Sequence, residues 1–396
     1  MNIGYFVGHF PYKDFGNIDE YTKRYHHDGG INVAYNLALN MAKRGHEINV
    51  FTTSIDFRDS IERYDNITIY RYGTNFRIAS GNFSFNLFLK PIRHKVDILH
   101  THVGNPIADL AGYAYVKRNK NMPFIITYHG DGQKDIGSFI RNTSVFFYNK
   151  YLLDKVLSRA DIIISPSEYY IDESRFLGKY RDKIVVIPNG INIWDFGIPH
   201  SKEECREKLG LSIDKNVILF VGNLTPYKGP DVLVEAMPII INKIPNTDLV
   251  FVGSGRMRTE LEELSKKLGV KKCVKFAGFV EEGLKPLYYK AADVFCLPST
   301  LNTEVFPMVL LEASASGLPM VVSDLNTFKC IIEDGYNGLF TKRGNKNSLA
   351  DAIIYLLENE EVRKEMGRNA RKKVKNYSWE RIAEMTEEVY KSLIEQ

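Results

Sequence analysis

Glu304 and Glu312 bracket the start of an expected helix in the segment 304–313, Glu-Val-Phe-Pro-Met-Val-Leu-Leu-Glu-Ala. Pro307 suits the first helical position, where its missing N–H costs nothing. Such a helix start offers unpaired N–H groups and a partial positive charge to a phosphate. Each carboxylate can accept two hydrogen bonds from hydroxyl groups. The segment therefore predicts a site for a phosphate, with sugar hydroxyls on one glutamate and ribose hydroxyls on the other.

The alternative interpretation of these glutamates is structural. Glu304 would then be a charge that favours the helix dipole, and Glu312 would be solvated. Glu312 counts against this alternative, because it lies between Leu311 and Ala313 in an otherwise apolar helix.

Three further loops in this half of the chain follow expected strands. In the loop 222–229, Lys228 is placed to neutralise a diphosphate at the start of the next helix. The turn 253–255, Gly-Ser-Gly, lets a backbone approach a nucleotide closely, and Arg256 beside it can stack on a base or pair with a phosphate. The strand end 277–280 has backbone groups that can contact a base edge. For each loop the alternative is an exposed turn without a ligand.

Short apolar, β-branched runs alternate with segments of helical spacing along the whole chain. Continuous apolar runs indicate strands buried on both faces, as in parallel sheets, and their alternation with helices indicates βαβ units. The segment 30–45 illustrates the helices, since it has one apolar stripe and ends at Gly45. We expect strands at 3–7, 47–52, 67–72, 98–101, 124–127, 161–165 and 184–187, and then at 217–221, 248–252, 274–277, 294–297 and 320–323.

The series breaks between Pro188 and Lys202, where turn residues without periodicity indicate a linker. We therefore predict an α/β fold of two Rossmann-like, doubly wound domains facing each other across a cleft, residues 1–193 and 194–377. Ligands of such sheets bind beyond the carboxyl ends of the strands. Residues 378–396 form a last helix with one apolar stripe, which we expect to pack back on the N-terminal domain.

Motifs in both halves follow the order and spacing of a known family. They are Gly29-Gly30, His100-Thr101-His102, Tyr128-His129-Gly130, Pro188-Asn189-Gly190, Gly222 to Gly229, Gly253-Ser254-Gly255, Ala277-Gly278 and, most specific, Glu304 to Glu312. In these motifs the chain resembles the retaining glycosyltransferases of family 4, the glycosyl transferases group 1, which have the GT-B fold. The resemblance covers nearly the whole chain. It implies transfer of a hexose from a UDP- or GDP-sugar to a hydroxyl of a glycan, lipid-linked or small-molecule acceptor.

The resemblance also implies roles for individual residues. Glu304 would bind hydroxyls of the transferred sugar, Glu312 the ribose and Lys228 the diphosphate. His129 would contact the donor sugar near the reacting carbon. The remaining donor-site residues would be Gly29 and Gly30 near the sugar and phosphates, the amides of Phe306, Met308 and Val309 beside Pro307, Gly278, Phe279 and Val280 at the base, and Gly253 and Arg256 near the base.

The chain departs from the family pattern at two of these positions. Asn223 stands where family members usually have an arginine for the diphosphate. A neutral amide compensates less of the charge of a departing diphosphate, so the leaving-group contact and the usual donor are both in question. Pro307 stands where glycine is common, although proline also suits a helix start.

Three histidines lie at expected strand ends in the first half. His100 and His102 alternate on one strand and so point to the same face. A metal site needs at least three ligands with an acidic or thiolate neighbour, so we expect a structural or acceptor-side role for this pair, and no metal. His129 on its own would be interpreted as structural, but its place at a strand end favours the donor site. We expect no cofactor, because the nucleotide sugar is a co-substrate.

Composition limits the partners and the compartment. A net charge of +4, from 52 basic and 48 acidic residues, is too small to indicate nucleic acid. Four cysteines without a C-x-x-C unit, and a start that lacks the charged region of a signal peptide, favour a cytoplasmic protein. The segment 72–95 mixes phenylalanines with basic residues. It is a candidate for peripheral contact with the inner face of a membrane or with a lipid-linked acceptor; the alternative is an amphipathic helix packed on the first domain.

Other functions remain open from the sequence. A GT-B nucleotide-sugar epimerase or phosphorylase would share these motifs, and so would a non-catalytic nucleotide-sugar binder. An NAD-dependent dehydrogenase would need an intact G-x-G-x-x-G after the first strand, which Gly4 and Gly8 do not supply.

Overall fold

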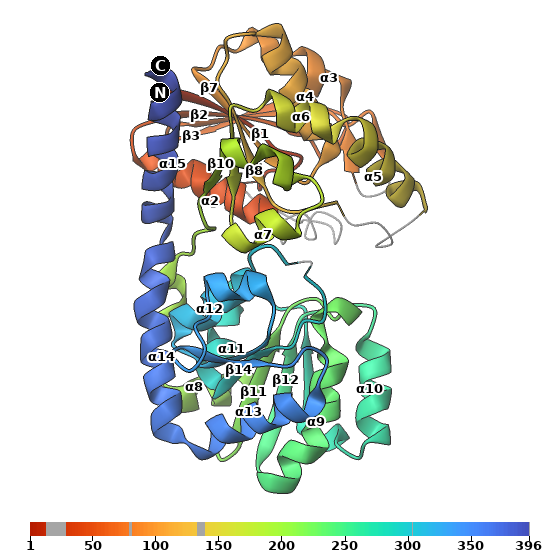
Figure 1. Ribbon diagram of the computed structural model, residues 1–396, viewed down its shortest axis with the longest axis vertical. Helices are drawn as coiled ribbons and strands as arrows, with labels where there is room; N and C mark the ends of the chain where they lie inside the picture. Colours follow the sequence, from red (N-terminus) through yellow and green to blue (C-terminus); the bar gives the residue numbers. More distant parts are fainter. Residues whose placement is uncertain (13–28, 79–80, 133–138, 303, 396) are drawn as a thin grey trace. The chain divides into compact units, whose positions relative to one another are not determined.

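The computed structural model describes residues 1–12, 29–78, 81–132, 139–302 and 304–395. The chain forms two compact units (Figure 1). Unit 1 comprises Met1–Gly190 together with Trp379–Gln396, and unit 2 comprises Ile191–Ser378. Unit 1 therefore takes up both ends of the chain, and the boundary between the units falls after Gly190.

Unit 1 is built on a sheet in the order β10-β9-β8-β7-β1-β2-β4-β3. All neighbouring strands are parallel except β3, which runs antiparallel to β4 at the edge. β2 lies on one side of β1 and β7 lies on the other, so the sheet extends from β1 in both directions, as in a doubly wound fold. The strands are β1 Asn2–Phe6, β2 Glu47–Thr53, β3 Ser60–Tyr64, β4 Ile67–Tyr72, β7 Ile98–Val103, β8 Phe124–Tyr128, β9 Ile162–Ser165 and β10 Ile184–Val186, with a separate hairpin of β5 Phe76–Ile78 and β6 Gly81–Phe83.

Helices cover both faces of this sheet, with α2 and α15 on one side and α3, α4 and α6 on the other (Figure 1). The apolar stripe of α2, from Val33 to Met41, is buried, which confirms the helix expected at 30–45. The segment 72–95 is not one amphipathic helix: it contains the β5–β6 hairpin and the short α3. The helices of unit 1 are α2 Gly29–Lys43, α3 Phe85–Leu89, α4 Pro106–Arg118, α5 Phe139–Tyr151, α6 Leu153–Arg159, α7 Glu168–Glu173 and α15 Trp379–Ile394.

The C-terminal helix α15 packs against α2 and completes the core of unit 1. Glu387 of α15 accepts hydrogen bonds from Arg44 Nε at 2.9 Å and from His46 Nε2 at 3.0 Å. Burial alone would raise the pKa of Glu387, but Arg44, Lys391 and His46 hold it at about 2. At the entry to the helix, a Cβ on Gly190 would lie 2.5 Å from the ring of Trp379. Only glycine fits there, which explains the residue type.

Asp109 on α4 is a fully buried carboxyl group whose Oδ2 accepts a hydrogen bond from Tyr148 at 2.8 Å. Burial raises its pKa to about 8, from about 3.9 in an unfolded chain. The native state therefore binds a proton more tightly, and its stability falls as pH rises from about 4 to about 8. We expect urea unfolding to show wild type losing on the order of 2–3 kcal/mol more than Asp109→Asn between pH 5 and pH 7. Equal losses would contradict the prediction.

Unit 2 is built on a fully parallel sheet in the order β13-β12-β11-β14-β15-β16. The order reverses between β11 and β14, so ligands are expected beyond the carboxyl ends of these two strands. The strands are β11 Asn216–Val221, β12 Thr247–Val252, β13 Val274–Gly278, β14 Val294–Leu297, β15 Met320–Ser323 and β16 Gly338–Thr341. The helices are α8 Lys202–Leu209, α9 Pro230–Lys243, α10 Arg258–Lys267, α11 Lys285–Ala291, α12 Met308–Ser316, α13 Lys346–Glu358 and α14 Glu360–Val374.

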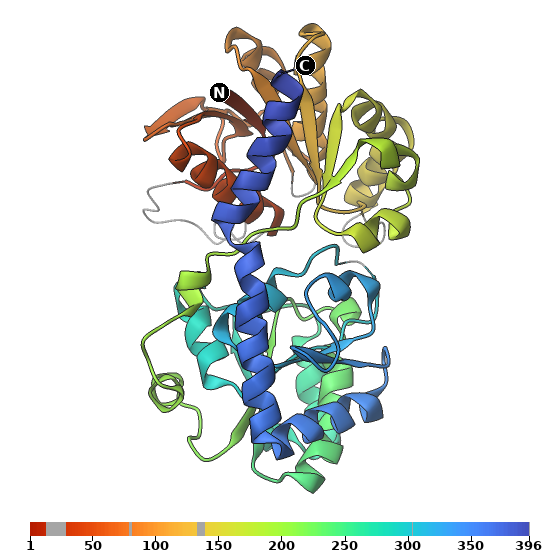
Figure 2. The same ribbon diagram turned by 60° about the vertical axis from the view of Figure 1, so that its left-hand side comes forward.

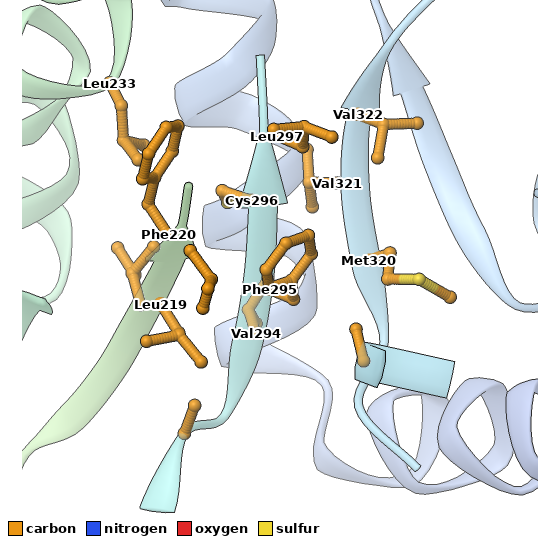
Figure 3. Packing of buried hydrophobic residues seen from close by; sticks show 14 of the residues in the cluster. Leu219, Phe220, Leu233, Val294, Phe295, Cys296, Leu297, Met320, Val321 and Val322 are labelled. Atoms are coloured by element: carbon orange, nitrogen blue, oxygen red, sulfur yellow. The ribbon is translucent and has the colours of Figure 1, made fainter. Parts of the chain in front are cut away.

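The core of unit 2 is packed on both faces of its central strands (Figure 3). Every residue of β14 and β15 is buried, and Phe220 of β11 lies against Leu233 of α9. Cys296 belongs to this core. Strands buried on both faces hold their carboxyl ends rigidly, which positions the loops described next.

Candidate functional site

The loops after β11, β12 and β14 pack together backbone to backbone. A Cβ on Gly229 would lie 2.1 Å from the carbonyl oxygen of Pro298, and one on Gly253 would lie 2.1 Å from that of Gly222. Gly229 and Gly253 also have positive φ values, of 64° and 131°. Each position thus requires glycine for two reasons: a side chain would clash with the facing backbone, and a positive φ favours glycine. The glycines bring the loop that carries Lys228 beside the loop that carries Glu304.

Lys228 and Glu304 form an ion pair at the carboxyl edge of the sheet. Lys228 Nζ lies 3.0 Å from Glu304 Oε1, and the two side chains are 12% and 11% exposed. Ser299, just beyond β14, donates a second hydrogen bond to Glu304 Oε1 at 3.0 Å. The chain thus brings a cation and a carboxylate from distant segments to the point where the strand order reverses.

The helix α12 begins beside this pair, at Met308, with Pro307 as the N-cap residue. Pro307 was the expected first helical position, but its backbone is extended, with a ψ of 109°, so the helix starts one residue later. Pro307 has no side-chain oxygen, and it makes no side-chain cap hydrogen bond to the first turn, which contains the amides of Met308 and Val309. The side chain of Phe306 is buried beside the ring of Tyr377, at 5.8 Å between centroids.

Glu312 lies in the second turn of α12 and is buried, so the interpretation of a solvated glutamate is wrong. Tyr289 donates a hydrogen bond to Oε2 at 2.7 Å, and Lys285 Nζ lies 3.4 Å from Oε1. Burial lowers the pKa of Lys285, but the carboxylates of Glu312 and Glu282 outweigh this and raise it above its ordinary value. Burial and the charge of Glu312 both raise the pKa of Tyr289. The Glu312 carboxylate is held by two side chains and keeps lone pairs for further hydroxyl groups.

The other residues expected at the donor site of unit 2 lie in loops around this centre. Gly253 joins the ends of β12 and β13, because its amide donates to the carbonyl oxygen of Gly278 at 2.7 Å. Arg256 and Phe279 are exposed, and Val280 packs against the core. Asn223 is exposed in the loop after β11. Within the described residues, no hydrogen bond or ion pair joins the side chain of Arg256 or Asn223 to the Lys228–Glu304 pair.

In unit 1, His129 lies immediately after β8 and is half-buried. Its Nε2 lies 3.0 Å from Nδ1 of His102, on the neighbouring strand β7. Gly29 and Gly30 are the first residues of α2, and the segment before them falls outside the described residues. Within the described ranges, no group of three or more His, Cys, Asp or Glu side chains is placed to hold a metal ion.

Sequence reasoning missed the partners that hold the expected residues. Ser299 had a usable signal, since it stands just after an expected strand at the carboxyl edge. Lys285 and Tyr289 had none, because they lie on a different helix with an ordinary composition. The sequence did not predict the hydrogen bond between His102 and His129. Its only related signal was that His100 and His102 point to the same face of their strand.

Comparisons with known proteins identify the family of the chain. The model of the family "Glycosyl transferases group 1" matches residues 201–373, and that of "Glycosyltransferase Family 4" matches residues 27–194. The uncharacterized glycosyltransferase MJ1607 of Methanocaldococcus jannaschii is 33% identical over 373 residues, which cover 91% of this chain and 93% of that protein. The O-antigen chain mannosyltransferase C of Escherichia coli is 28% identical over 360 residues, covering 89% and 91%.

The fold also matches solved structures. Anabaena HepE, crystallised with UDP and glucose, superposes with a TM-score of 0.72 at 18% identity, over 99% of this chain and 100% of that chain. This likeness concerns the fold alone, whereas the sequence relatives carry the activity class. The protein therefore has the GT-B fold and is a glycosyltransferase that belongs to family 4, the glycosyl transferases group 1.

Proposed function

We propose that the enzyme transfers a hexose from a UDP- or GDP-sugar to an acceptor hydroxyl, with retention at the anomeric carbon. The observation that carries this proposal is the largely buried Lys228–Glu304 pair beside the start of α12, where Pro307 provides no side-chain cap. A cation and open amides suit a diphosphate, and a carboxylate suits sugar hydroxyls. The complex of HepE with UDP and glucose supports this donor class.

In this mechanism the bond between the anomeric carbon and the diphosphate oxygen breaks, and a bond to the acceptor oxygen forms on the same face. Lys228 and the amides of Met308 and Val309 stabilise the negative charge that develops on the departing diphosphate. The acceptor proton passes to a phosphate oxygen of the donor, so no protein base is needed. Asn223 adds no charge, which leaves Lys228 as the cation that the diphosphate meets in this loop.

Glu312 binds the ribose hydroxyls in this proposal, and Tyr289 and Lys285 hold its carboxylate in place. We expect Tyr289→Phe to raise the KM for the donor about tenfold, because it removes a hydrogen bond to a charged group, with little change in kcat. Tyr288→Phe is the matched control, since Tyr288 is the neighbouring residue and makes no bond to Glu312. Steady-state kinetics with varied donor measures both. An unchanged donor KM in Tyr289→Phe would remove Glu312 from the ribose site.

A donor screen tests the proposal. UDP-, GDP- and ADP-sugars are compared for thermal stabilisation, since a ligand at 100 times its Kd adds about 2.7 kcal/mol. NMR of the product with the stabilising donor then gives the anomeric configuration. Inversion would overturn the retaining mechanism. An altered sugar formed without acceptor would indicate an epimerase, and binding without transfer or slow hydrolysis would indicate a non-catalytic binder.

We also propose that unit 1 makes peripheral contact with an anionic membrane surface through α5. In this helix polar side chains face the interior, and apolar side chains face the solvent. Its inward residues Tyr148 and Asn149 hydrogen-bond to Asp109 and to the carbonyl oxygen of Gly132. Its outward side chains are large, apolar and exposed: Phe139, Ile140, Phe146, Phe147 and Tyr151. Within the described residues, no helix is long and apolar enough to cross a membrane.

Positive charge beside this surface supports a lipid headgroup as its partner. Lys150 lies 5.5 Å from the centre of the Phe146 ring. A surface hollow of about 410 Å³ next to α4 and α6 is lined by Lys117, Lys120, Lys155, Arg159, Tyr113, Val116 and Ser158. Such a mixture of aromatic and basic side chains suits an interface with anionic lipids.

Co-sedimentation with vesicles tests this contact. Wild type is expected to bind phosphatidylglycerol vesicles and not phosphatidylcholine vesicles, and Phe147→Ser is expected to weaken binding. Phe57→Ser is the control, because Phe57 is 77% exposed in the loop between β2 and β3 and does not belong to α5. Equal binding by wild type and Phe147→Ser would exclude α5 as the contact, and self-association lost in Phe147→Ser would indicate a second copy of the chain instead.

A further inference from the structure

Three imidazole rings form a stack on one face of the sheet of unit 1. His100 and His102 of β7 lie 4.6 Å apart between ring centroids, and His102 and His129 lie 5.2 Å apart with an interplanar angle of 16°. His100 and His102 are buried, and burial lowers the pKa of both imidazoles. Two neutral rings thus lead from the interior to the half-buried His129.

His100 and His102 differ in their hydrogen bonds. His100 uses both nitrogens, with Nδ1 2.6 Å from Tyr390 Oη and Nε2 2.7 Å from Thr127 Oγ1. His102 uses Nδ1, which lies 3.0 Å from His129 Nε2, while its buried Nε2 has no partner in the described part of the chain. His100 is therefore a saturated structural residue, and His102 points its single hydrogen bond at His129.

The unpartnered nitrogen decides which ring donates. A neutral imidazole carries one N–H group. If the proton of His102 were on Nε2, a buried N–H group would have no acceptor, and orphaned buried N–H groups are rarer in folded proteins than under-satisfied acceptors. With the proton on Nδ1, His102 donates to His129 and only an acceptor is left unpaired. The second arrangement is favoured, so Nε2 of His129 is an acceptor and its proton is on Nδ1.

We propose that His102 is a positioning residue that fixes the tautomer and the orientation of His129. His129 then carries its proton on Nδ1, and its Nε2 lone pair is occupied by His102. This step rests on the proposed function, in which the family resemblance gives His129 the contact with the donor sugar. With Nε2 occupied by His102, His129 takes no proton through that nitrogen. The hydrogen bond from His102 thereby sets the chemistry of His129, the outermost ring of the stack.

Two substitutions of His102 separate its hydrogen bond from its ring. Phe keeps the stacked ring and removes the N–H group, whereas Asn keeps an N–H group near the position of Nδ1. We expect His102→Phe to lower kcat/KM for transfer about 10–100-fold, the equivalent of a lost orienting hydrogen bond, and His102→Asn to restore most of the loss. His100→Phe is the matched control, because it removes bonds to Tyr390 and Thr127 without touching His129.

Two measurements test the inference: a double-mutant cycle between His102 and His129, and a nitrogen NMR spectrum. In a His129→Ala background, His102→Phe should cause no further loss, since it acts through His129. Nitrogen NMR of histidine-labelled enzyme should show His129 protonated at Nδ1 in wild type, and a mixture of tautomers in His102→Phe. A His129 protonated at Nε2 in wild type, or full activity in His102→Phe, would overturn the inference. Full activity in His129→Ala would instead remove His129 from the proposed function, and the spectrum would still decide the tautomer.

Discussion

Replacing Lys228 by methionine should lower kcat for sugar transfer on the order of 10²–10³-fold, the effect of removing one charge aimed at a developing anion. Methionine keeps most of the buried stem and removes only the ammonium group. The loss should fall on kcat because the diphosphate gains charge as it departs. Steady-state kinetics with saturating acceptor, compared with donor affinity from calorimetry, separates this loss from weaker binding.

Lys215→Met provides the matched control. Lys215 is also ion-paired, with Nζ 2.7 Å from Asp248 Oδ1, but it lies away from the carboxyl ends of the strands. We expect it to lose stability without losing turnover. If Lys228→Met turned over donor like wild type, the leaving-group assignment would be wrong.

Glu304→Gln should reduce kcat/KM at least 100-fold while the protein remains folded, because a charged acceptor for sugar hydroxyls becomes a weaker, neutral one. The same change leaves the Lys228 ammonium without its counter-charge in a site that is mostly closed to water. A loss of about 1–3 kcal/mol in unfolding free energy is therefore expected.

The double variant Lys228→Met/Glu304→Gln separates these effects. Its stability should recover relative to the sum of the single variants, because neither group is left unpaired, while transfer stays low. Denaturant unfolding and kinetics on the same four proteins give both quantities. Transfer near the wild-type rate in Glu304→Gln would show that the carboxylate does not bind the transferred sugar.

Most of the parallel strands were predictable, because burial on both faces leaves a continuous apolar run. Val294–Leu297 and Met320–Ser323 were expected with the observed bounds. The missed strands lack that signal. β3, Ser60–Tyr64, is a mostly exposed antiparallel edge strand, and β16, Gly338–Thr341, is short and begins with glycine.

The site was predictable in its residue types and less so in its contacts. A lysine after β11 and a glutamate before α12 were expected near one ligand, and the structure brings their side chains to 3.0 Å. The side chains that orient Glu312 could not be found, because Tyr289 reaches it from another helix and only tertiary packing decides such a pair. The sequence predicted Gly229 and Gly253 only as turn residues. In the structure each also lies against the backbone of another loop, which leaves no space for a side chain.

The return of the chain to unit 1 has a consequence for biosynthesis. Trp379, Ile382 and Tyr390 belong to the hydrophobic core of unit 1, yet they are translated only after the whole of unit 2. During synthesis part of the apolar surface of unit 1 therefore stays uncovered until the ribosome has released α15. A premature stop codon between unit 2 and α15 would thus damage the unit whose synthesis began first.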